Sequence, residues 1–143
     1  KIDISEMRKI DLIVIHCTAT RANKDFTLEA LRHCHVVENH WSDIGYHFYI
    51  RKDGTIYPCR PPSKVGAHAR GHNAHSIGVC YEGGLDAKGR PADTRTSWQK
   101  ASLIELLKKL KLLYPDAKIV GHYELGAKKA CPCFCASREY SKL

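Results

Sequence analysis

Residues 12–16 read Leu-Ile-Val-Ile-His, an unbroken apolar run that is rich in β-branched residues and ends on a histidine. A run without polar alternation is typical of a strand that is buried on both faces of a sheet. Residues 76–81 form a second such segment, which Gly83-Gly84 closes. Together they predict an α/β fold, a single domain with a central mixed β-sheet flanked by helices.

A helix is expected soon after the first strand. Thr27, with Glu29 in the first turn, predicts a helix that runs to about residue 40. Its expected inner face includes Leu28, Leu31 and Val36.

A second, longer helix is predicted over residues 96–113. Thr96 and Gln99 have the spacing of a capping box, and Pro115 ends the pattern. Five leucines recur at helical spacing and are expected to face the core: Leu103, Leu106, Leu107, Leu110 and Leu113.

The remaining segments complete the mixed fold. Asp53-Gly54 between two β-rich runs is a strong hairpin signal. The other expected elements, in chain order, are strands over residues 46–50 and 55–59, an exposed loop over 83–95, a strand over 118–120 and a short helix over 136–141.

Length and composition limit the class of protein. The chain has 143 residues, of which 43% are hydrophobic and 27% charged. We expect residues 8–143 to form one domain and residues 1–7 to be an N-terminal extension. No apolar run is long enough to span a bilayer. The polar start over residues 1–8 predicts that this chain carries no signal peptide.

The net charge of +8 predicts attraction to polyanions, among them nucleic acid, anionic membranes and the bacterial cell wall. Most basic residues are scattered and form no stripe, so nucleic-acid binding is not expected. The seven cysteines are odd in number and lie mostly within hydrophobic segments. We therefore expect at least one free thiol and no disulfide framework.

Three potential metal ligands stand where the fold would bring them together. His16 and His122 each follow a buried strand, and Cys131 lies in the next loop. A catalytic zinc site uses three protein ligands and keeps the fourth for water, whose pKa falls to about 7. Nine histidines offer many chance trios, however, so spacing alone leaves a structural role open for each of them.

Seven motifs stand in the order seen in zinc-dependent N-acetylmuramoyl-L-alanine amidases, and the chain resembles the superfamily that holds the phage-type amidase lysozymes and the peptidoglycan recognition proteins. The resemblance covers about residues 8–140. Its motifs are His16-Cys17-Thr18-Ala19-Thr20, Asp43-Ile44-Gly45-Tyr46-His47-Phe48, Asp53-Gly54-Thr55, Gly66-Ala67-His68-Ala69, Asn73 with Ser76-Ile77-Gly78-Val79, Gly121-His122 and Lys129-Ala130-Cys131-Pro132.

The resemblance implies hydrolysis of the amide bond between N-acetylmuramic acid and L-alanine in bacterial peptidoglycan. It makes His16, His122 and Cys131 the ligands of one Zn²⁺ per chain, with Tyr46 and Lys129 as catalytic residues. A hydroxyl near the metal can relay a proton, and an ammonium can stabilise an oxyanion.

Other residues receive roles from the same resemblance. His68 is expected to contact substrate, while Asn73 and Ser76 shape the turn before a strand. His47 should pack in the core, because strand alternation turns it away from Tyr46. Five further histidines are expected to be structural or at the surface: His33, His35, His40, His72 and His75.

The chain departs from relatives at two cysteines. One branch of the superfamily carries a catalytic glutamate where this chain has Cys80, so the acid/base role of that glutamate cannot be transferred to this chain. The absence of the glutamate favours a catalytic role for Tyr46. Cys135 replaces the aspartate that commonly follows the ligand cysteine. Neither Cys133 nor Cys135 is expected to bind zinc, because a fourth thiolate would close the coordination shell.

Parts of the sequence are compatible with three other functions. A non-catalytic peptidoglycan-binding module of the same fold would lose the ligand cysteine, which is present here. A zinc knob or nucleic-acid binder built on Cys131, Cys133 and Cys135 lacks paired Cys-x-x-Cys motifs. A cysteine hydrolase using Cys17 would need a thiol that strand alternation should bury.

The expected partners are bacterial peptidoglycan or muropeptides, with no nucleic acid and no membrane span. The protein is expected to be a monomer that acts on the cell wall, in the periplasm or outside the cell.

Overall fold

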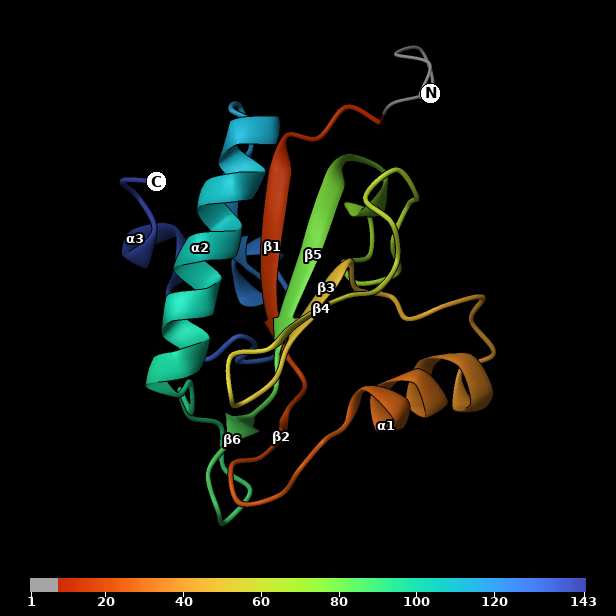
Figure 1. Ribbon diagram of the computed structural model, residues 1–143, viewed down its shortest axis with the longest axis vertical. Helices are drawn as coiled ribbons and strands as arrows, with labels where there is room; N and C mark the ends of the chain where they lie inside the picture. The colour runs from red at the N-terminus through yellow and green to blue at the C-terminus, as the bar shows by residue number, and fades with distance from the viewer. Residues whose placement is uncertain (1–7) are drawn as a thin grey trace.

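A five-stranded mixed sheet forms the centre of the fold (Figure 1). The computed structural model describes residues 8–143, so the expected extension over residues 1–7 lies outside the described residues. In sheet order the strands are β4 (Ile56–Pro58), β3 (Phe48–Ile50), β5 (Ser76–Tyr81), β1 (Leu12–Cys17) and β7 (Lys118–Gly121). β1 runs parallel to β5 and β7, β5 runs parallel to β3, and β4 is antiparallel to β3.

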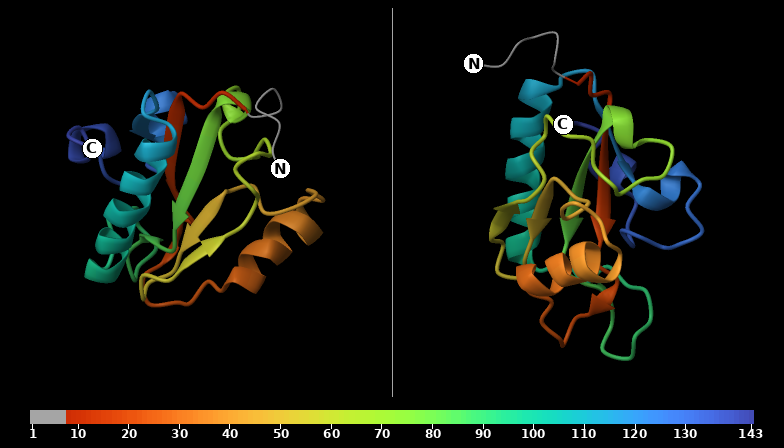
Figure 2. Two further views of the ribbon diagram at one scale, coloured as in Figure 1. Left: turned by 45° about the horizontal axis from the view of Figure 1, so that its top comes forward. Right: turned by 90° about the vertical axis from the view of Figure 1, so that its right-hand side faces the viewer.

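The two apolar runs are the central strands, as predicted. All six residues of β1 and all six of β5 are buried. Alternate side chains of β1 serve opposite faces: Ile13 and Ile15 pack in the cluster of α2 (Ser97–Leu113), whereas Val14 lies in a different cluster. Figure 2 shows that α2 lies along one face of the sheet, whereas α1 (Leu28–Arg32) does not lie on that face.

The capping box of α2 is confirmed. Thr96 Oγ1 accepts a hydrogen bond from Gln99 N at 3.1 Å, and Gln99 Oε1 accepts one from Thr96 N at 2.9 Å. Four of the five leucines are buried, but Leu113 is 68% exposed, so the prediction is wrong there. The helix ends at Leu113, and Tyr114 packs against the core instead.

The first helix begins as predicted, with Thr27 Oγ1 accepting from Ala30 N at 3.1 Å. From residue 33 it continues as a π-helical segment, η2 (His33–Glu38), and ends earlier than residue 40. The wider π turn changes the angle between successive residues. His35 is therefore buried, whereas the expected inner residue Val36 is only half-buried.

The segment over residues 83–95 is an exposed loop only in its middle, where Ala87, Lys88, Arg90, Pro91 and Asp93 are exposed. It contains β6 (Gly84–Leu85), which pairs with β2 (Thr20–Arg21) in a second, parallel sheet. Arg95 is buried because Asp93 and Glu139 pair with its guanidinium at 2.8 and 2.6 Å. The charge of the buried Arg95 is thus balanced by the two carboxylates that pair with it.

Other bounds differ from the predictions by a few residues, as element ends commonly do. No helix among the described residues is long and apolar enough to cross a membrane. The remaining short helices are η3 (Asn73–His75), η4 (His122–Leu125) and α3 (Ala136–Glu139).

A buried carboxylate joins the hairpin to the end of β5. Glu82, 1% exposed, accepts hydrogen bonds from Arg51 Nε at 2.9 Å, from Phe26 N at 2.7 Å and from Lys52 N at 3.0 Å. Burial opposes ionisation of Glu82, but these donors outweigh it and hold the pKa of the carboxyl below its ordinary value. The ionised side chain is therefore part of the folded structure.

We expect Glu82→Gln to lower the free energy of unfolding by about 2 kcal/mol at pH 7, because Arg51 loses its buried partner. A depressed carboxyl pKa contributes stability above the unfolded pKa of about 4.3, and this is lost as pH falls through the folded value. Glu82→Gln should lack this loss of stability on acidification. Urea unfolding between pH 3 and 7 measures both effects.

Glu105→Gln, on the exposed face of α2, is the control and should change stability by less than about 0.5 kcal/mol. An equal pH dependence of stability in wild type and Glu82→Gln would contradict the role assigned to Glu82.

Candidate metal and catalytic site

The three predicted ligands converge at one edge of the sheet. His16 is the penultimate residue of β1, His122 begins η4 directly after β7, and Cys131 lies in the following loop. Their ligand atoms all lie within 4.8 Å of one another. Because β1 and β7 are parallel neighbours, their carboxyl ends meet at the same edge and bring the two histidines together.

The distances and charges suit a metal ion. Cys131 Sγ lies 3.9 Å from His16 Nδ1, close to the roughly 3.6 Å between a sulfur and a nitrogen ligand around tetrahedral zinc. Burial lowers the pKa of His16 well below its ordinary value, and burial followed by the charge of Lys129 lowers the pKa of His122. Both imidazoles are therefore neutral near pH 7, as metal ligands must be.

The third ligand is held by the backbone around it. Cys17 N donates a hydrogen bond to Cys131 Sγ at 3.1 Å, and Tyr123 N donates to Cys131 O at 2.9 Å. Cys133 Sγ instead lies 3.3 Å from Gly84 O, and Cys135 Sγ lies 3.7 Å from Ser137 Oγ.

Tyr46 lies beside the ligand cluster, just before β3. Its ring centroid is 5.0 Å from that of His16. Burial, followed by the nearby thiols of Cys80 and Cys131, raises the pKa of Tyr46 well above its ordinary value. The phenol is therefore protonated at neutral pH and can donate a hydrogen bond or a proton.

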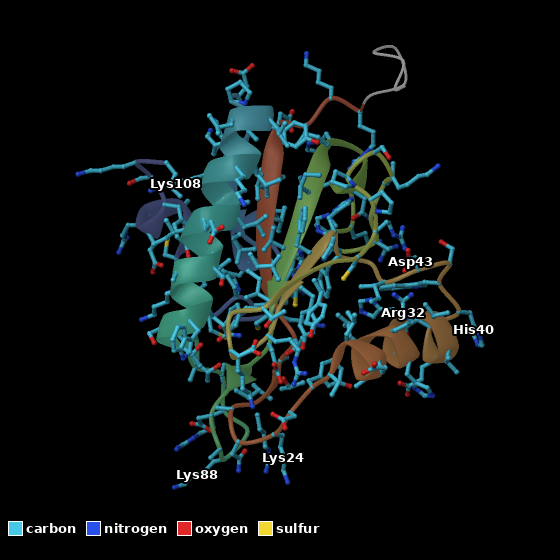
Figure 3. All side chains as sticks on the ribbon, viewed as in Figure 1. Lys24, Arg32, His40, Asp43, Lys88 and Lys108 are labelled. Carbon is cyan, nitrogen blue, oxygen red and sulfur yellow. The ribbon has the colours of Figure 1, made fainter. Side chains whose placement is uncertain are left out.

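The loop that leads to Tyr46 is fastened to α1. Arg32 and Asp43 form an ion pair at 3.2 Å (Figure 3), and Asp43 Oδ1 also accepts from Ile44 N at 2.7 Å. Arg60 Nε donates to Ile44 O at 3.0 Å, and Arg60 N donates to Tyr46 O at 3.1 Å. These bonds place Tyr46 through its backbone.

Lys129 is exposed and stands two residues before Cys131 in the chain. It borders a cavity of about 530 Å³ whose lining includes Tyr123, Lys128 and Phe134. Its charge acts on His122, as the lowered pKa of that residue indicates.

His68 joins the cluster in a way that sequence reasoning missed. His16 Nε2 lies 2.9 Å from His68 Nδ1, and His68 Nε2 lies 3.1 Å from Ser76 Oγ. Burial lowers the pKa of His68 to about 3. Both ring nitrogens thus have protein partners, and the expected contact of His68 with substrate stays a prediction. A regular sequence pattern does not signal a bond between residues 52 positions apart.

The other reactive side chains are structural. His47 is fully buried, and its Nδ1 accepts from Gly78 N at 3.0 Å. His35 Nδ1 accepts from Gly45 N at 2.9 Å. Cys17 is 6% exposed, and a contact with Cys131, then burial, raises the pKa of its thiol. Cys17 is thus a poor nucleophile, and the cysteine-hydrolase alternative has no support.

Comparisons with known proteins agree with this geometry. Residues 6–134 match the family described as N-acetylmuramoyl-L-alanine amidase. The endolysin of Klebsiella phage KP32 is 40% identical over 142 residues, which cover 99% of this chain and 93% of the endolysin. The endolysin of Escherichia phage T7 is 39% identical over the same shares.

A similar solved structure is the N-acetylmuramoyl-L-alanine amidase LysC from Clostridium intestinale URNW. It has a TM-score of 0.76 at 34% identity and covers 94% of this chain and 83% of its own. The Drosophila peptidoglycan recognition protein SD has a TM-score of 0.75 at 23% identity, over 96% and 82% of the two chains, and shares the fold. The predicted fold class is confirmed.

We expect Cys133→Ser and Cys135→Ser to keep the metal, because these thiols point at Gly84 and Ser137 and not at the cluster. Cys131→Ser should lose it, since only Cys131 offers sulfur to the two histidines. Metal content after dialysis, measured by elemental analysis, distinguishes the three variants. Loss of the metal from Cys133→Ser or Cys135→Ser, with the fold intact, would contradict the three-ligand site.

Proposed function

Because the chain belongs to the N-acetylmuramoyl-L-alanine amidase family, we propose that His16, His122 and Cys131 hold one zinc ion at its active site. The enzyme hydrolyses the amide bond between N-acetylmuramic acid and L-alanine in peptidoglycan. The convergence of two neutral imidazoles and one thiol within 4.8 Å supports the zinc assignment most directly. We further propose that residues 8–143 constitute the amidase domain.

Zinc suits this donor set, and when bound it supplies Lewis acidity and activates water at neutral pH. Three protein donors leave room for a fourth ligand, as catalytic zinc sites do. The protein side chains have two further tasks. One group must donate a proton to the departing amide nitrogen, and another must stabilise negative charge on the carbonyl oxygen.

We assign the proton-donating task to Tyr46. Its phenol is protonated at neutral pH and lies next to His16. Cys80, which occupies the place of a catalytic glutamate in one branch of the superfamily, is fully buried, and burial raises the pKa of its thiol. Cys80 therefore cannot replace a carboxylate as a base, and the hydroxyl of Tyr46 is the suitable group at this side of the site.

We assign charge stabilisation to Lys129. Its exposed ammonium stands on the His122 side of the cluster, beside the cavity of about 530 Å³. A cation there stabilises a carbonyl oxygen more strongly as its negative charge develops. Tyr46 and Lys129 thus approach the scissile amide from different sides of the metal ligands.

Peptidoglycan or its muropeptides are the proposed partners, and the cell wall, in the periplasm or outside the cell, is the proposed place of action. The net charge of +8 favours association with an anionic wall. We propose a monomer without a nucleic-acid partner, since a single chain contributes every assigned group. Retention of all three ligands separates this enzyme from a module of the same fold that only binds peptidoglycan.

Mass spectrometry of digested peptidoglycan tests the reaction. The purified chain of residues 1–143 should release stem peptides that begin with L-alanine and leave peptide-free glycan. Elemental analysis should find one zinc per chain; a chelator should abolish release, and added zinc should restore it. Full activity in a preparation without stoichiometric divalent metal would refute the zinc assignment, and intact peptidoglycan after digestion with zinc-loaded protein would refute the reaction.

Tyr46→Phe and Lys129→Ala should each lower kcat by about 100-fold or more, while muropeptide affinity and zinc content persist. The loss in the double variant should be smaller than the product of the two losses, because both groups serve one chemical event. Turnover and affinity must be measured on the same zinc-loaded proteins.

Tyr57→Phe and Lys108→Ala provide matched controls, because they make the same chemical changes on β4 and on the exposed side of α2. Both should keep normal turnover. Near-normal kcat in Tyr46→Phe and Lys129→Ala would remove these two residues from the mechanism.

A further inference from the structure

His16 offers its two ring nitrogens to different partners. Nδ1 lies 3.9 Å from Cys131 Sγ, whereas Nε2 lies 2.9 Å from His68 Nδ1. A nitrogen that binds a metal carries no proton, so a neutral His16 that ligates through Nδ1 has its proton on Nε2. Nε2–H then donates to His68, and His68 Nδ1 must be the acceptor.

The same logic extends to Ser76. A neutral His68 that accepts at Nδ1 carries its own proton on Nε2. That nitrogen is 3.1 Å from Ser76 Oγ, and Ser76 is fully buried at the start of β5. The hydroxyl oxygen of Ser76 can accept a hydrogen bond from this N–H. If His16 donates to His68 and His68 donates to Ser76, both histidines have hydrogen-bond partners on these nitrogens.

The space around His68 is built for its ring. A Cβ on Gly78 would lie 2.6 Å from His68 Cγ, and a Cβ on Gly66 would lie 2.8 Å from His68 Cδ2, closer than real Cβ atoms come. The backbone is also held, because Asn73 Oδ1 accepts from His68 N and Ala69 N, both at 2.9 Å. The ring of His68 therefore has little freedom to leave His16.

We propose that His68 is a positioning residue, which accepts the Nε2–H of His16 and thereby turns Nδ1 of His16 toward Cys131 and the metal. This inference rests on the proposed zinc site. Such a partner on the second ring nitrogen fixes the tautomer and orientation of a ligating histidine and raises its basicity. His68 acts through His16 and does not need to touch the substrate.

Two substitutions separate the acceptor from the rest of the side chain. His68→Leu removes both hydrogen bonds, whereas His68→Asn places Oδ1 close to the former Nδ1 and keeps an acceptor for His16. We expect His68→Leu to weaken zinc binding by about 10- to 100-fold in competition with a chelator. His68→Asn should recover most of that affinity. In zinc-saturated His68→Leu, kcat should fall while KM stays near the wild-type value.

Nitrogen-15 NMR of the zinc-loaded wild type tests the tautomer directly. His16 should be protonated at Nε2 and bound to metal through Nδ1, and its Nε2–H resonance should persist in His68→Asn and disappear in His68→Leu. A merely structural role would not change this signature.

His75→Leu is the control, because His75 directly precedes Ser76 in the chain but pairs with Asp11. It should lower thermal stability and leave zinc affinity unchanged.

Binding of zinc through Nε2 of His16, or equal zinc affinity in wild type and His68→Leu, would overturn the positioning role. The wild-type NMR result decides the matter even if His68→Leu does not fold. Failure of the wild type to bind zinc at all would instead refute the proposed function, so the two failures are distinguishable.

Discussion

The parallel pairing of β1 with β5 and β7 is the constraint on which the site depends. Both faces of β1 are buried, so its side chains must alternate between the α2 cluster and the opposite layer. His16 is 2% exposed at the carboxyl end of this strand, beside the end of β7. A shift of β1 by one residue would send His16 into the α2 core and bring Cys17 to the ligand cluster.

Burial of the site decides the protonation of its groups. His16 is buried and His68 and Tyr46 are partly buried, and this burial keeps all three uncharged near neutral pH. A neutral histidine can offer a lone pair to a metal on one side and an N–H to a neighbour on the other. Lys129, which we propose to stabilise negative charge in the reaction, lies instead at the exposed edge of the site.

Two buried ionic networks, apart from the site, hold the segments that carry it. Glu82 ties the Arg51 hairpin to the end of β5, beside the carboxyl end of β3. Arg95 pairs with Glu139 on α3, and its guanidinium lies 3.4 Å from the centroid of the Phe134 ring. Phe134 follows Cys131 by three residues, so this stack helps to hold the loop that carries Cys131. The structure of these loops thus depends partly on paired charges that lie outside the cluster of His16, His122 and Cys131.

The sequence by itself determined the central strands and the capping box of α2, because these depend on local periodicity and on residues close together in the chain. It singled out the trio of His16, His122 and Cys131 through the motifs of the amidase family, because spacing alone left other roles open. The structure decided what depends on contacts between distant segments. The π turn that buries His35, the pairing of β6 with β2 and the burial of Arg95 each require partners that no local pattern names. The contact of His16 with His68 is the clearest case. Gly66 and Gly78 have no side chains and so leave space for the ring of His68, and only the folded sheet brings His68 Nδ1 within 2.9 Å of His16 Nε2.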